Sequence, residues 1–129
     1  MTTHGAVNRA RLVVRHGPLV GPVLSRVVGM LAARALFPID RLDDALLVTD
    51  ALAAHASGPA LDGHVSVVVT AHEGELELRV GPLRPGGGAD LVAASELPTV
   101  GNVLERVADD VRVETDEDEY LVVRLSTSR

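Results

Sequence analysis

Apolar residues recur along this chain with two different periods, and each period predicts its own kind of element. Helical spacing runs through 22–36 and again from 40 to 56, so we expect two amphipathic helices there. Pro38 is expected to end the first helix, and Asp40 is placed to cap the second. Residues 57–59, Ser-Gly-Pro, stop the second helix.

Strands are predicted wherever β-branched or alternating residues form short runs. In 75–80, leucine and valine alternate with glutamate and arginine, which is typical of a strand with one solvated face. The predicted strands are 11–15, 64–71, 75–80, 111–115 and 120–125. Residues 81–88 are rich in glycine and proline and predict a loop, followed by a short helix at 89–95 and a longer one at 98–109. This order predicts an α+β two-layer sandwich, with helices packed on one face of a mostly antiparallel mixed sheet.

Length and composition favour one domain. A chain of 129 residues that is 47% hydrophobic supports a single core, which we expect over 10–126 between a flexible tail at 1–9 and a short tail at 127–129. Cysteine is absent, which excludes disulfides and thiolate chemistry. The first residues lack the pattern of a secretory signal and no apolar stretch is long enough to span a bilayer, so we expect a cytoplasmic protein away from membranes.

The charge pattern excludes one class of partner. The net charge is −6, and arginine supplies all 12 of the basic residues other than histidine. An acidic domain without a basic stripe repels phosphate backbones, so we expect no direct binding of nucleic acid. The histidines lack the helical spacing of a metal site, and we expect no bound metal. Gly86, Gly87 and Gly88 precede a predicted helix and offer backbone amides to an anion, with a ligand-free surface loop as the alternative.

Two segments carry a resemblance to a known family. They are DDALLVTDALAAHA at 43–56 and VADDVRVE at 107–114. With the order of elements, they resemble the histidine-kinase-like ATPase fold, and within it the small bacterial anti-sigma-factor serine kinases. The resemblance covers roughly residues 10–125. It implies a Mg–ATP site, a catalytic acid on the second helix, and a sigma factor or an antagonist protein as partner.

The ligand positions that this resemblance implies are altered here. The family carries an acid and, four residues later, a magnesium-binding asparagine on one helix face; Asp50 and Ala54 stand at these positions. Pro82 replaces the aspartate that reads adenine, and the later glycine-leucine-glycine turn keeps only Gly101. Asp50 would be the catalytic base in an active member, and Gly86, Gly87 and Gly88 would contact the nucleotide.

These observations lead to three hypotheses. The first is a regulatory protein-binding module that resembles an anti-sigma factor, without a cofactor and without kinase activity. By the resemblance, its partner contacts are Arg15, Arg26 and Arg34, with ordinary surface charges as the alternative for each. The second hypothesis is an active serine/threonine kinase that uses ATP with magnesium. The third is a structural dimerisation domain, since homodimers are common in the family.

Overall fold

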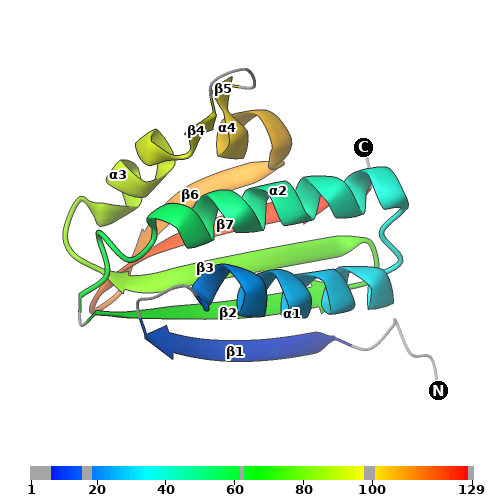
Figure 1. The fold of residues 1–129 in the computed structure, drawn as a ribbon, viewed down its shortest axis with the longest axis horizontal. Coiled ribbons are helices and arrows are strands. Elements are labelled where there is room, and N and C mark those ends of the chain that lie inside the picture. The colour runs from blue at the N-terminus through cyan, green and yellow to red at the C-terminus, as the bar shows by residue number, and fades with distance from the viewer. Residues whose placement is uncertain (1–6, 16–18, 62, 98–100, 128–129) are drawn as a thin grey trace.

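The chain folds around one antiparallel sheet. A computed structural model describes residues 7–15, 19–61, 63–97 and 101–127. Five strands form the sheet in the order β1-β2-β3-β7-β6, and every neighbouring pair is antiparallel (Figure 1). Their bounds are β1 Asn8–Arg15, β2 His64–His72, β3 Glu75–Leu83, β6 Asp110–Thr115 and β7 Glu119–Ser126. The first strand thus begins inside the range that the sequence assigned to an N-terminal tail.

Helices form the second layer. α1 (Val20–Arg34) and α2 (Ile39–His55) lie side by side on one face of the sheet (Figure 1). Beyond them, toward the β6 side, come α3 (Gly87–Ala94), the small ribbon of β4 (Glu96–Leu97) and β5 (Gly101–Asn102), and α4 (Val103–Val107). This arrangement confirms the predicted α+β two-layer sandwich. None of the described helices is long and apolar enough to cross a membrane.

The core lies between the sheet and the two long helices. Leu76, Leu78 and Val80 are fully buried on the helix-facing side of β3, whereas Glu75, Glu77 and Arg79 point to the other face. The alternation in this strand is therefore confirmed. Against it pack the apolar stripes of the helices, which include Val28 of α1 and Leu52 of α2.

The bounds of most elements differ from the sequence prediction by a few residues, and α3 begins at Gly87, inside the loop predicted for 81–88. Three differences have a clear physical reason, and the first corrects the same loop prediction at its other end. β3 continues through Gly81 and Pro82 to Leu83, which the sequence placed in a loop. Leu83 is 1% exposed in the core and pairs with Glu119 across a register shift in β3. Burial of this one leucine therefore outweighs the local loop preference of glycine and proline.

The helix predicted for 98–109 was also wrong in extent. Within the described residues only Val103–Val107 is helical, and 98–100 lie outside them. Gly101 has a φ of +84°, which no helix residue adopts. The side chain of Asn102 then caps α4 by accepting a hydrogen bond from the Glu105 amide at 3.2 Å.

The predicted cap of the second helix was wrong by two residues. Pro38 occupies the N-cap position and Asp40 lies in the first turn, where its charge still favours the helix dipole. Between the helices, Leu36 adopts a φ of 65°, and the amide of Phe37 donates to the Ala32 carbonyl at 3.1 Å. This Schellman pattern ends α1 before the proline is reached.

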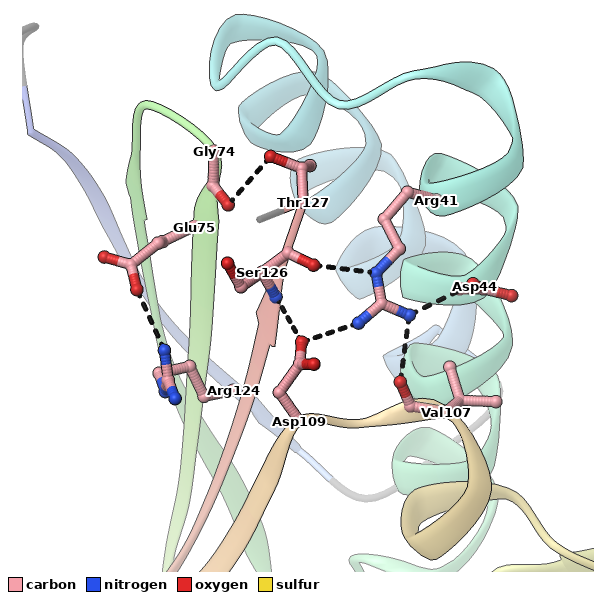
Figure 2. A network of polar contacts seen from close by, with 9 residues as sticks. All are labelled: Arg41, Asp44, Gly74, Glu75, Val107, Asp109, Arg124, Ser126 and Thr127. Atoms are coloured by element: carbon pink, nitrogen blue, oxygen red, sulfur yellow. Dashed lines mark hydrogen bonds and ion pairs between the residues drawn. The ribbon is translucent and has the colours of Figure 1, made fainter. Parts of the chain in front are cut away.

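One arginine, Arg41, connects the start of α2 to the end of α4 and to the hairpin formed by β6 and β7. The side chain of Arg41 is only 11% exposed and donates to the backbone carbonyls of Ser126 at 3.1 Å and Val107 at 2.9 Å (Figure 2). It also pairs with Asp109 at 2.6 Å and Asp44 at 3.1 Å. Asp109 in turn accepts the Ser126 amide at 2.5 Å. These bonds fix α2, the end of α4 and both strands of the last hairpin relative to one another.

Replacement of Arg41 by methionine tests this clamp. We expect Arg41→Met to lower the free energy of unfolding by about 2–3 kcal/mol, because Asp109 and two carbonyls lose their donor. Urea denaturation measures the loss. Arg84→Met is the matched control: the Arg84 side chain is half exposed and, among the described residues, pairs with Asp90 alone, so we expect a loss of at most about 0.5 kcal/mol. Equal losses in both variants would contradict the role of the clamp.

Candidate functional site

A small hollow lies beside Asp50 and Ala54, the two positions at which the resemblance implies a catalytic acid and a magnesium ligand. It has a volume of about 100 Å³ and lies between α2 and the end of α3. Asp50, Ala54 and His55 line it from α2, and Ser95 and Glu96 close the other side. The four-residue spacing therefore brings Asp50 and Ala54 to one hollow, as helix geometry requires.

Asp50 is an exposed side chain with a partner on the neighbouring helix. Its Oδ1 accepts a hydrogen bond from the Ser25 hydroxyl of α1 at 3.0 Å. One turn later, Ala54 brings only a methyl group to the hollow. Within the part of the chain that the structure describes, no group of three or more acidic or histidine side chains is arranged to hold a metal ion.

The glycine turn binds a carboxylate of the chain itself. Gly86 is the N-cap of α3, with a φ of +83°. The amides of Gly86 and Gly88 donate to the two carboxylate oxygens of Glu119, at 3.1 and 2.7 Å. A helix N-terminus with free amides attracts anions, and here Glu119 is that anion. The turn is therefore an internal cap on α3.

Close packing explains the other two glycines. A Cβ atom on Gly87 would lie 2.8 Å from the Cβ of Pro59, and one on Gly88 would lie 2.8 Å from a methyl of Val113. Both distances are shorter than van der Waals contact, so any side chain there would force its neighbours to move. The structure thus provides a packing reason for each of these glycines.

The residues that are present do not fit Mg–ATP. Sites for molecules of this size usually enclose about 300 Å³ or more, and the hollow beside Asp50 is well below that. Gly86 and Gly88 lie at the opposite end of α3 from the hollow, about 12 Å away along a helix of eight residues. Pro82 lines a depression on the other face of the sheet. The turn that precedes Gly101, which the resemblance also assigns to the nucleotide, includes residues 98–100, and these lie outside the described residues.

The outer face of the sheet carries a lattice of ion pairs on its β3-β7-β6 half. Arg112 pairs with Asp110 at 2.5 Å and with Glu114 at 2.9 Å, and Arg79 also pairs with Glu114. Hydrogen bonds from Arg112 first, and then from Arg79, lower the pKa of the Glu114 carboxyl. Arg79 also lies over the ring of Tyr120, 4.3 Å from its centroid. These charges satisfy one another, which is typical of a solvated structural face.

The β1 and α1 side of the molecule carries arginines of a different kind. Arg26 and Arg34 are exposed on α1, and Arg9 and Arg11 are exposed on β1. No described acid lies within ion-pair distance of any of these four side chains. Arg15 ends β1, and its side chain lies outside what the structure describes. Unpaired arginine beside exposed apolar side chains is a common composition for protein interfaces.

Two acids with structural roles were not predicted from the sequence: Asp109, which pairs with Arg41, and Glu119, which caps α3. Asp109 lies in the VADDVRVE segment, where it was noted only as part of a motif, and Glu119 lies one residue before the strand predicted at 120–125. A carboxylate next to a glycine-capped helix start has no local sequence signal, because the two partners are 31 residues or more apart. No protein-family model matches the chain, and a comparison with curated proteins finds no significant match.

The packing explanation of the glycine turn leads to a stability test. Gly88→Ala is expected to lower the free energy of unfolding by about 1–3 kcal/mol, since its Cβ would meet Val113 and the Glu119 carboxylate. Gly58→Ala is the matched control: its Cβ would find ordinary contact at 3.7 Å, and its stability should stay the same or rise slightly. Thermal unfolding measures the stability of both variants relative to the parent protein. A Gly88→Ala protein as stable as the parent would contradict the packing explanation.

Proposed function

We propose that this chain is a regulatory protein-binding module that acts by contact with a partner protein and without phosphoryl transfer. The occupation of the α3 amides by Glu119 carries this proposal, because by the resemblance that turn would contact the nucleotide. By the same resemblance, the partner is a sigma factor or an antagonist protein, and the setting is the cytoplasm of a bacterium.

The unpaired arginines support a protein partner. Arg26 and Arg34 are exposed on α1 of an acidic domain and have no acid within ion-pair distance among the described residues. A guanidinium forms paired hydrogen bonds with carboxylates, so such residues suit an acidic surface on another protein. Met30 is also exposed, at 52%, on the same helix.

Calorimetric titration with Mg–ATP and with ADP tests the absence of nucleotide chemistry. We expect no heat of binding and no thermal shift, because Ala54 offers no magnesium ligand and the α3 amides already have a partner. The Asp50→Ala variant is the control for specific binding. A dissociation constant below about 100 μM, lost in Asp50→Ala, would overturn the proposal and favour the active serine/threonine kinase.

Partner binding is tested by charge reversal on α1. We expect Arg26→Glu to abolish binding in a two-hybrid screen against sigma factors and their antagonist proteins from the source genome, with an unchanged melting temperature. Arg106→Glu in α4 makes the same change of charge at another exposed arginine and should leave binding intact. Binding retained in Arg26→Glu would exclude Arg26 from the interface.

A further inference from the structure

The two edges of the sheet are unequal. At one edge, β6 is approached by the start of α3, where Gly88 lies against Val113. Its outer side chain Arg112 is neutralised by Asp110 and Glu114. At the other edge, β1 pairs only with β2 among the described strands. An edge strand presents a row of backbone donors and acceptors to any extended chain that approaches it.

The outer face of β1 carries two exposed arginines, of which Arg11 also lines a depression that reaches Asp116, Glu117 and Asp118. Arg9, Arg11 and Val13 point to this face, whereas Ala10 and Leu12 pack against the core. Neither arginine has an acid within ion-pair distance among the described residues. A strand added beside β1 would therefore place alternate side chains next to unpaired guanidinium groups.

The other face of such a strand would meet α1. Gly21, Ser25 and Gly29 of α1 lie against α2. At about 100° per residue, Val23, Met30 and Arg34 lie on the opposite side of the helix. Because α1 packs on β2 and β1, with α2 on its other side, this flank faces the β1 edge of the sheet (Figure 1). Val23 and Met30 are both exposed there.

We propose that β1 is a docking edge for an extended acidic segment of the partner protein, which adds to the sheet as a further strand. Its acidic side chains lie beside Arg9 and Arg11 on the outer face. Its alternate, apolar side chains lie under Val23 and Met30 of α1. This assignment rests on the proposed function as a protein-binding module and states the chemistry of the segment that is bound.

Charge selects this occupant over a second copy of the chain. Antiparallel pairing of β1 with its own copy would continue the sheet and place the outer faces of the two strands side by side. Arg9 and Arg11 would then lie close to the same residues of the copy. Like charges opposite one another destabilise a strand pair. An acidic segment reverses the sign of that interaction and also suits the neighbouring Arg34.

Nuclear magnetic resonance with designed peptides tests the proposal on the intact chain. The probe is a short capped peptide that alternates glutamate with valine, and the control peptide has lysine in place of each glutamate. We expect the glutamate peptide to shift and protect the amides of β1 from exchange, and we expect the lysine peptide to leave them unchanged. Methylation of alternate backbone nitrogens in the glutamate peptide should abolish its binding, because added strands bind through these donors.

Protein variants locate the charges. Arg11→Glu should weaken the glutamate peptide by about tenfold, and Arg9→Glu should do the same, whereas Arg106→Glu, with an equal change of charge, should not. Unchanged amide spectra outside β1 show that each variant remains folded. Equal binding of both peptides, no binding up to about 1 mM, or undiminished binding in Arg11→Glu would each overturn the proposal.

Two outcomes separate this proposal from the proposed function. If the free protein is a dimer whose β1 amides are already protected, the edge belongs to a second copy and the acidic segment is excluded. If the peptides fail while Arg26→Glu still abolishes partner binding, the protein-binding function stands and docking occurs elsewhere. Tight binding of Mg–ATP would overturn the proposed function without bearing on the peptide result.

Discussion

The position of α2 depends on one nearly buried cation. Burial of a guanidinium is costly unless its donors are satisfied, and Arg41 meets this condition with two carbonyls and two carboxylates (Figure 2). The acceptors come from three separate parts of the chain, so the bonds form together only in the complete fold. Asp109 lies just before β6 and Ser126 ends β7, which places the base of the last hairpin under the start of α2. The face of α2 that carries Asp50 is thereby held at a fixed place over the sheet.

The same hairpin sends Glu119 to the start of α3. Glu119 opens β7, opposite Leu83 at the end of β3, and the turn at Gly86 follows directly. The carboxylate compensates the dipole of α3 and satisfies two amides that would otherwise need water or a ligand. In this chain the helix start is complete without any bound anion. Architecture alone does not decide whether such a turn binds an anion from solution, since function depends on the site and not on the fold.

Local pattern predicted most of the elements, and it failed where a distant contact decides the outcome. The alternation of Leu76, Leu78 and Val80 was sufficient for β3, because burial on one face leaves a period of two in the sequence. Leu83 was assigned to a loop, since neither its burial nor its pairing with Glu119 is visible in neighbouring residues. In the candidate site, the shared face of Asp50 and Ala54 followed from helix geometry alone. The anion that occupies the glycine turn did not follow, because Glu119 is distant in sequence.

The charges at the two edges of the sheet differ in what they can do. At β6, Arg112 already has acidic neighbours, so an approaching strand gains little from it. At β1, Arg9 and Arg11 have no acid within ion-pair distance among the described residues, so they repel a strand of like charge and attract an acidic one. The same two arginines therefore disfavour pairing with a second copy of β1 and favour an acidic segment, because the charge of the approaching strand determines whether it is repelled or attracted. The exposed flank of α1 adds a second requirement, an apolar side chain at alternate positions, which a merely acidic and disordered segment would not meet.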